Sequence, residues 1–153
     1  MTMNKIEILL VEDNEADVEL TIHALRQHKL AERIQVARDG EEALDYLFCR
    51  GAYSARTFDR PPRLVLLDLK LPKLAGQEVL REVKSDARTK AIPVVVMTSS
   101  VEEKDVTQSY RLGVNSYVQK SMEFDLFRQR VKQLGLYWLD VNEPPPLDAF
   151  LME

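Results

Sequence analysis

Apolar and polar residues follow two alternating patterns along this chain. Short runs rich in aliphatic or β-branched residues cover residues 5–11, 33–37, 64–68 and 92–98, and a short, more polar run covers residues 115–120. Runs of this length, bounded by polar or turn-forming residues, are typical of strands that are buried in a sheet. We therefore predict five strands.

Between and after these runs, apolar residues recur with the period of an amphipathic helix. The predicted helices cover residues 15–28, 40–48, 75–86, 100–113 and 122–140. In the last of them, five apolar side chains fall within one stripe at about 100° per residue: Phe124, Phe127, Val131, Leu134 and Trp138. Residues 51–63 show no period and contain two prolines, which predicts a long surface loop.

Local signals mark several helix ends. Asn14 with Asp17, and Ser100 with Glu103, have the spacing of a capping box at a helix start. Gly113 stands where a helix commonly ends in a left-handed residue, and three prolines at 144–146 stop the last helix. These signals agree with the periodicity.

Five apolar strands that alternate with five helices predict one fold class. Such strands form a parallel sheet with helices on both faces and right-handed crossovers, because each strand needs cover on both sides. We expect a doubly wound α/β domain. Connection lengths alone do not fix the strand order.

Composition narrows the function classes. A chain of 153 residues with 45% apolar content suits one domain, and its net charge of −4 gives no general reason to bind nucleic acid or an anionic membrane. The single cysteine, Cys49, cannot form an internal disulfide, and with only two histidines, His23 and His28, we expect all three to be structural. No apolar run is long enough for a signal peptide or a membrane span, so we expect a cytoplasmic protein.

Polar side chains follow the predicted strands at their carboxyl ends, where open α/β sheets bind ligands. Glu12 and Asp13 follow the first strand and Asp68 the third; Thr98 ends the fourth and Lys120 follows the fifth. Crowded carboxylates repel one another and need a cation, and Mg²⁺ is the hard divalent ion that fits oxygen ligands. Together with a lysine and a threonine, this site could accept a phosphoryl group on Asp68 and form an aspartyl phosphate.

With these residues the sequence resembles a response-regulator receiver domain of two-component signalling over residues 5–140. The stretches "VED", "LLDLKLP", "VVVMTSS" and "NSYVQK" carry the resemblance. It implies Asp68 as phospho-acceptor, a metal site of Glu12, Asp13, Asp68 and the backbone carbonyl of Lys70, and Thr98, Lys120 and Tyr117 as phosphoryl-binding and switch residues. It also implies the flavodoxin-like strand order 2-1-3-4-5.

The resemblance implies a function as well. A sensor histidine kinase would transfer its phosphoryl group to Asp68 with Mg²⁺ bound. The face formed by the fourth helix, fifth strand and fifth helix would then change its binding preference, and hydrolysis would reset it. Such a protein is not an enzyme in the usual sense, although it assists its own phosphorylation and dephosphorylation.

Two positions depart from the family pattern. Ser121 stands where a proline in a cis peptide usually follows the lysine, so we expect a trans bond there, because a cis bond without proline costs about 2.5–4 kcal/mol. Ala75 stands where Asn or Asp is common, which predicts a helix without a polar cap.

The missing proline, the long loop at 51–63 and the "YWLDV" end of the last helix resemble single-domain receivers that partner phytochrome-type light-sensing kinases. We expect one receiver domain over 1–143 and a proline-rich tail over 144–153, which is too short for an output domain.

A homodimer is also predicted. Three apolar residues of the last helix fall outside its buried stripe and would contact a second copy together with the apolar tail; they are Leu126, Leu136 and Tyr137, and the tail residues are Leu147, Phe150 and Leu151. The alternative is a disordered tail.

Three other functions are also compatible with these residues. A magnesium-dependent phosphatase or phosphotransferase would also use a strand-end aspartate, although Lys70 occupies the position of its usual second acid. A flavin-binding protein shares the fold, but "EDNEAD" would repel a phosphate. A scaffold that has lost the chemistry is the third.

Overall fold

Five parallel strands form the central sheet of this protein. The computed structural model describes residues 8–31 and 33–150. The strands are ordered β2-β1-β3-β4-β5, and their bounds are β1 (Ile8–Val11), β2 (Ile34–Ala37), β3 (Leu64–Leu67), β4 (Val94–Thr98) and β5 (Ser116–Gln119). The doubly wound fold and its strand order are therefore confirmed, although residues 5–7 of the predicted first strand lie outside the described residues.

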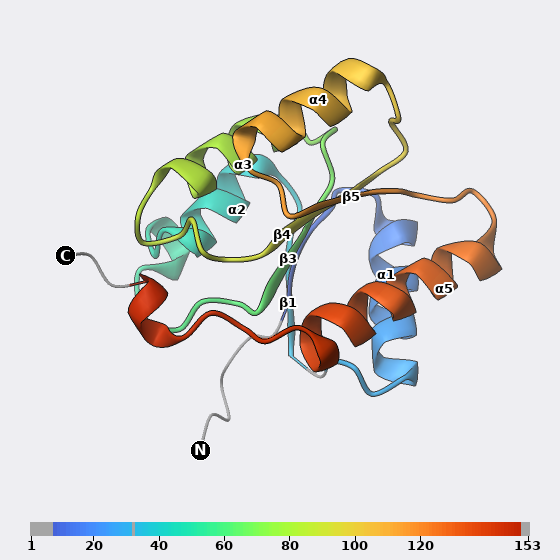
Figure 1. Cartoon of the computed structure of the whole chain (residues 1–153), viewed down its shortest axis with the longest axis horizontal. Coiled ribbons are helices and arrows are strands. Elements are labelled where there is room, and N and C mark those ends of the chain that lie inside the picture. Colours follow the sequence, from blue (N-terminus) through green and yellow to red (C-terminus); the bar gives the residue numbers. More distant parts are fainter. Residues whose placement is uncertain (1–7, 32, 151–153) are drawn as a thin grey trace.

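Helices cover both faces of the sheet, as Figure 1 shows. α1 and α5 lie on one face, and α2, α3 and α4 lie on the other. Their bounds are α1 (Glu15–Gln27), α2 (Gly40–Leu47), α3 (Gly76–Ser85), α4 (Glu103–Leu112) and α5 (Phe124–Gly135). None of the helices in the described part of the chain is long and apolar enough to cross a membrane.

Side-chain alternation along the strands separates the core into two clusters. Leu9 and Val11 of β1 belong to the cluster under α2 and α3, whereas Ile8 and Leu10 belong to the cluster under α1 and α5. All four residues are buried, because β1 lies inside the sheet and has helices on both faces. This burial fixes the register, since a one-residue slip would exchange the two sets.

Two of the predicted helix ends are confirmed and one is wrong. The Asn14 side chain accepts a hydrogen bond from the Asp17 backbone N–H, and Gly113 ends α4 with φ of 104°. The capping box predicted at Ser100 does not form: α4 starts at Glu103, after Glu102, without a side-chain cap. The Ser100 hydroxyl instead donates to the Asp105 carboxylate at 2.6 Å.

The last helix differs from the predicted stripe at both ends. Phe127 and Val131 are buried as predicted, but Phe124 is 73% exposed because it is the first residue of α5 and extends past the core. After Gly135 the chain continues as a π-helical segment, Leu136–Val141. Its wider turn brings Leu139 into the core, a position that a 3.6-residue period does not select.

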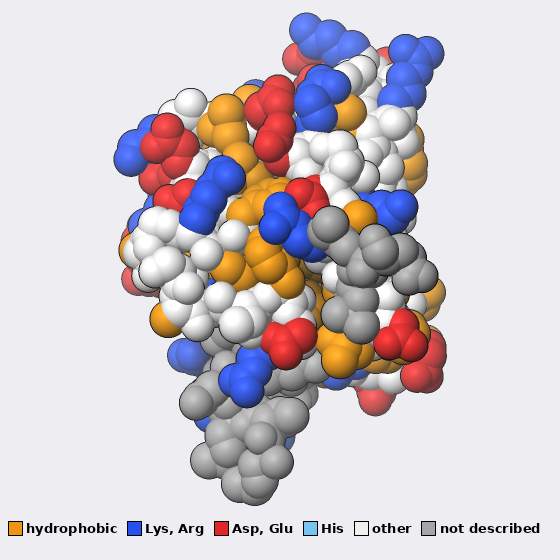
Figure 2. Space-filling view, turned by 90° about the vertical axis from the view of Figure 1, so that its left-hand side faces the viewer, with side chains coloured by type: hydrophobic (Ala, Val, Ile, Leu, Met, Phe, Trp, Pro, Cys, Tyr) orange, Lys and Arg blue, Asp and Glu red, His pale blue; other side chains and the backbone are white. Residues whose placement is uncertain are grey.

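The C-terminal segment crosses from the α5 face to the opposite face of the sheet (Figure 1). Leu147–Phe150 forms a short 3₁₀ turn, and Phe150, only 5% exposed, packs into the cluster under α2 and α3. Figure 2 shows the side of the molecule on which this segment ends, where hydrophobic side chains gather between charged ones. Assigning Phe150 to a dimer contact was therefore wrong, while Leu147 is 51% exposed and Leu151 lies outside the described residues.

Candidate functional site

The carboxyl ends of the strands bring the predicted polar residues to one rim. Glu12 and Asp13 follow β1, and Asp68 follows β3, its direct neighbour in the sheet. Within the described residues, oxygens of these three carboxylates lie within 4.8 Å of one another. Asp13 and Asp68 are 55 residues apart in the sequence, but the fold brings their carboxylates close together.

Close packing fixes the backbone at Asp68. A side chain at Gly76, the first residue of α3, would place its Cβ 2.2 Å from the Asp68 carbonyl oxygen, so this position requires glycine. The backbone N–H of Lys70 donates to Asp68 Oδ1 at 3.3 Å. Helix α3 therefore begins directly against the strand end that carries Asp68.

The three carboxylates repel one another, because their negative charges lie close together and two of the groups are buried. Glu12 and Asp68 are buried, and Asp13 is exposed. Burial, with the nearby Asp68 charge, raises the pKa of Glu12 to about 7, although the hydrogen bond to Lys120 acts in the opposite direction. Oxygen ligands with excess negative charge suit a hard divalent cation such as Mg²⁺, which keeps part of its water shell. The residues present therefore fit a magnesium site.

Lys120 supplies the positive charge of the rim. Its ammonium lies 2.6 Å from Glu12 Oε1, 2.9 Å from Asp68 Oδ2 and 2.8 Å from Asp17 Oδ2. Burial acts to lower the pKa of Lys120, but hydrogen bonds to the three carboxylates outweigh it and raise the pKa above its ordinary value. Lys120 is therefore a fixed ammonium group beside Asp68.

Sequence reasoning missed Asp17 as a member of this site. The sequence pattern assigns it only as the capping partner of Asn14, and its backbone N–H does serve that cap at 3.0 Å. Its carboxylate, however, contacts Lys120. No local pattern could have found it, because its partner Lys120 lies 103 residues away in the sequence.

Thr98 is fully buried at the end of β4. Its Oγ1 has no hydrogen-bond partner among the described residues. Its backbone carbonyl accepts a hydrogen bond from the Lys120 N–H at 2.7 Å, so the two residues are held side by side across β4 and β5. A buried hydroxyl without a partner is costly, so Thr98 is a candidate hydrogen-bond donor to a ligand bound at this rim.

Tyr117 links β5 to the loop that follows Thr98. Its hydroxyl donates to the Ser100 carbonyl at 2.8 Å, and burial raises the pKa of Tyr117. Its ring packs against the cluster under α2 and α3. The predicted switch aromatic is therefore connected to the β4–α4 loop and not to the rim itself.

The two sequence departures have the predicted local effects. The described residues contain no cis peptide bond, which includes the bond between Lys120 and Ser121. Ala75 occupies the N-cap position of α3 with extended backbone and no side-chain cap. Neither position supplies a carboxylate of the rim.

Comparisons with known proteins agree with this geometry. A family model of the response regulator receiver domain matches residues 8–132. The chain is 43% identical over 140 residues to response regulator Rcp1 of a Synechocystis strain, which covers 90% of this chain and 92% of Rcp1. It is also 43% identical over 138 residues to a probable methanogenesis regulatory protein, FilR2, of Methanothrix harundinacea, covering 90% and 86% of the two chains.

Solved structures of response regulators also have a fold similar to that of this chain. The phosphorylated cyanobacterial phytochrome response regulator RcpA matches with a TM-score of 0.86 and 42% identity, covering 93% of this chain and 99% of RcpA. The Mn²⁺-bound form of Rcp1 matches with a TM-score of 0.85 and 39% identity, covering 93% and 99%.

Proposed function

This chain belongs to the response-regulator receiver family, and from that membership we propose that Asp68 accepts a phosphoryl group from a phosphohistidine of a sensor histidine kinase. One observation carries the assignment: Asp68 is in contact with the Lys120 ammonium at 2.9 Å, on a rim that also holds the unpartnered hydroxyl of Thr98. Family membership favours this function over the phosphatase and flavin-binding alternatives.

The transfer is a simple displacement at phosphorus. One carboxylate oxygen of Asp68 forms a bond to phosphorus while the phosphorus–nitrogen bond to the donor imidazole breaks, and the electron pair of that bond returns to the nitrogen. Lys120 and Thr98 donate hydrogen bonds to the phosphoryl oxygens. Lys120 already lies beside Asp68, at 2.9 Å, whereas Thr98 reaches the phosphoryl group by moving toward it.

We assign the magnesium ligands from the same rim. Asp13 and Asp68 would bind the ion directly with the backbone carbonyl of Lys70, and Glu12 would act mainly through water. When bound, Mg²⁺ supplies positive charge that neutralises the phosphoryl oxygens. The Mn²⁺-bound form of Rcp1 and the acidic cluster support this assignment.

The phosphoryl group acts as a switch. Attraction of Thr98 to the new charge would move the β4–α4 loop, which Tyr117 contacts through the Ser100 carbonyl. The face of α4, β5 and α5 then changes its affinity for partners. Hydrolysis, in which water attacks phosphorus and the Asp68 carboxylate leaves, resets the protein without a second enzyme.

A phytochrome-type light-sensing kinase is the proposed phosphoryl donor, in the cytoplasm. RcpA is a cyanobacterial phytochrome response regulator, which supports this choice. The 43% identity to FilR2, a methanogenesis regulatory protein, shows that sequence similarity of this degree also extends to another context. Phosphotransfer from a panel of purified kinases, with and without a phytochrome sensor module, tests the choice.

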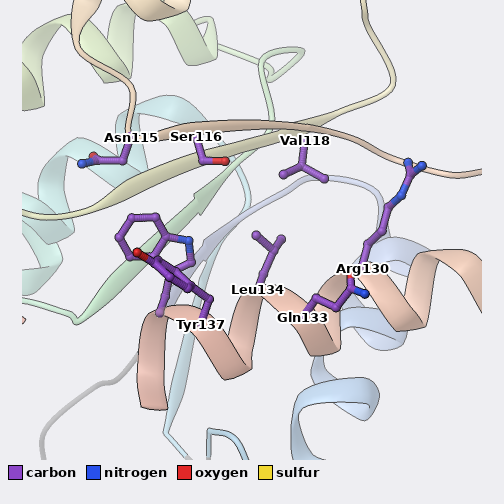
Figure 3. A pocket seen from close by; sticks show the side chains of 8 residues that line it. Asn115, Ser116, Val118, Arg130, Gln133, Leu134 and Tyr137 are labelled. Atoms are coloured by element: carbon purple, nitrogen blue, oxygen red, sulfur yellow. The ribbon is translucent and has the colours of Figure 1, made fainter. Parts of the chain in front are cut away.

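We also propose a homodimer through the outer side of α5 and of the π-helical segment that follows it. Leu126, Leu136 and Tyr137 are at least one third exposed. Beside them, a pocket of about 510 Å³ lies between β5 and the last helix, and Figure 3 shows Val118 and Leu134 facing this hollow with Tyr137 at its edge. An isologous contact would bury this apolar surface of both copies.

Light scattering tests the dimer. Wild type should have the mass of two chains, and the double variant Leu136→Glu with Tyr137→Glu should have the mass of one. Val101→Glu, which alters another exposed apolar residue, before α4, is the matched control and should remain dimeric. A monomeric wild type at high micromolar concentration contradicts the proposal.

The decisive test of phosphorylation is intact mass after incubation with a small acyl-phosphate donor. We expect one phosphate adduct that requires Mg²⁺, is released by hydroxylamine and is absent in Asp68→Asn. The control Asp125→Asn removes an exposed carboxylate of α5 and should leave the adduct unchanged. An adduct that persists in Asp68→Asn would place the acceptor elsewhere.

A further inference from the structure

One of the carboxylates that contact Lys120 has no role in the proposed metal binding or phosphoryl transfer. An ammonium group has three N–H donors, and in this structure three carboxylates accept them: Glu12, Asp17 and Asp68. Glu12 and Asp68 belong to the candidate metal site, but Asp17 does not. Its contact with Lys120 therefore needs a separate explanation.

Asp17 is well placed to hold an ammonium group. It lies in the first turn of α1, where its backbone N–H is bound by the Asn14 side chain at 3.0 Å. The Lys120 side chain is only 12% exposed, whereas the Asp17 side chain is 28% exposed, and the two groups are 2.8 Å apart. The cap fixes the backbone of Asp17, and this in turn limits where Lys120 can place its charge.

Phosphorylation of Asp68 would change which oxygens accept hydrogen bonds from Lys120. One of its three donors faces Asp68 Oδ2 before transfer, and a phosphoryl oxygen on Asp68 would then compete for that donor. The bonds to Glu12 and Asp17 can remain while the third donor changes its acceptor. An ammonium held at two points loses less freedom during this exchange than one held at a single point.

We infer that Asp17 is a positioning residue for phosphoryl transfer, which acts by holding the ammonium of Lys120 beside Asp68. The inference rests on the proposed phosphorylation of Asp68. The carboxylate of Asp17 contacts Lys120, so its effect on the transfer passes through that residue.

The test compares phosphorylation rates with a small acyl-phosphate donor at saturating Mg²⁺. Asp17→Asn keeps the size of the side chain and removes its charge, and we expect a rate about tenfold lower, which corresponds to about 1.4 kcal/mol. The matched control is Glu15→Gln. Glu15 is also a first-turn acid of α1, but it pairs with Arg38, so its variant loses the same helix-dipole interaction and should keep the wild-type rate.

A double-mutant cycle separates positioning from a general structural effect. In a Lys120→Ala background, Asp17→Asn should change the rate by less than twofold, because the residue through which it acts is gone. The inference is overturned if Asp17→Asn has an unchanged or higher rate, if Glu15→Gln slows transfer equally, or if the tenfold loss persists without Lys120.

A second measurement does not depend on phosphorylation. The ¹⁵N signal of the Lys120 ammonium, observed by NMR at low temperature, should be visible in wild type and Glu15→Gln and absent in Asp17→Asn because its protons then exchange rapidly with water. If wild type gains no phosphate, the proposed function fails, and this signal still decides whether Asp17 holds Lys120. A signal that persists in Asp17→Asn overturns the inference.

Discussion

Protonation of Glu12 should control how tightly the protein binds Mg²⁺ near neutral pH. Burial raises the pKa of this carboxyl to about 7, well above the ordinary pKa of a glutamate side chain. At that pKa, about one tenth of the groups are ionised at pH 6 and about nine tenths at pH 8. Because a proton on Glu12 removes charge that the cation needs, we expect the affinity for Mg²⁺ to fall about tenfold between pH 8 and pH 6.

Isothermal titration calorimetry with Mg²⁺ measures this effect directly. Titrations at pH 7 in two buffers with different ionisation enthalpies count the released protons, and we expect about half a proton per ion, because half of the Glu12 groups carry one at that pH. Glu12→Gln, which cannot titrate, should show a flat affinity and no proton release. A wild-type affinity that is constant from pH 6 to pH 8 would refute the reasoning, since a glutamate carboxyl with its ordinary pKa of about 4.3 is almost fully ionised throughout that range.

The raised pKa of Glu12 also predicts how the free energy of unfolding changes with pH when no metal is bound. Because the pKa of Glu12 is raised on folding, the folded state binds the proton more tightly, and this contribution is lost as pH rises through about 7. The free energy of unfolding of wild type should therefore decrease relative to that of Glu12→Gln between pH 5 and pH 8. Saturating Mg²⁺ should remove the difference at pH 8.

Three further predictions concern the fold and the buried hydroxyl. Phe150→Ala should lower the free energy of unfolding by about 3–5 kcal/mol in urea titrations, because it removes a buried ring, while Phe124→Ala at an exposed position should change it by less than about 1 kcal/mol. Thr98→Val should leave stability unchanged or raise it by up to about 1 kcal/mol, since the hydroxyl has no described partner, and should shorten the lifetime of the phosphate adduct; a loss of several kcal/mol would reveal a missing partner. Ala75→Asn should raise the melting temperature through about 1 kcal/mol of added N-cap stabilisation.

The fold and most of the rim could be predicted because both depend on short-range patterns. Strand positions followed from continuous apolar runs, and Asp68 and Lys120 are close together because each follows a strand of one parallel sheet. The strand order came from the family resemblance and not from the connections. Long-range arrangement is weakly encoded in any one segment, so a resemblance was needed to supply it.

The structural features that the sequence did not predict depend on contacts between distant segments of the chain. The partner of Asp17 is 103 residues away, so only the three-dimensional structure shows why the residue is there. Phe150 lies in a proline-flanked tail with no period, and its burial depends on the hydrophobic cluster that other elements form under α2 and α3. The π-helical turn at 136–141 likewise violates the 3.6-residue spacing on which the stripe was based.

The hydrogen bonds beyond the rim give a physical reason why phosphorylation should affect α4 and β5 together. Thr98 is two residues before Ser100, whose carbonyl accepts from Tyr117 and whose hydroxyl donates to Asp105 in the first turn of α4. The Asp105 carbonyl in turn accepts from Gln77 of α3 at 3.2 Å. These bonds are partly buried, and a typical intramolecular hydrogen bond contributes about 0.5–1.5 kcal/mol, so a few of them supply a free energy within the roughly 1–3 kcal/mol typical of coupling between sites. A shift of Thr98 toward Asp68 must therefore either break these bonds or move β5 and the start of α4 with it.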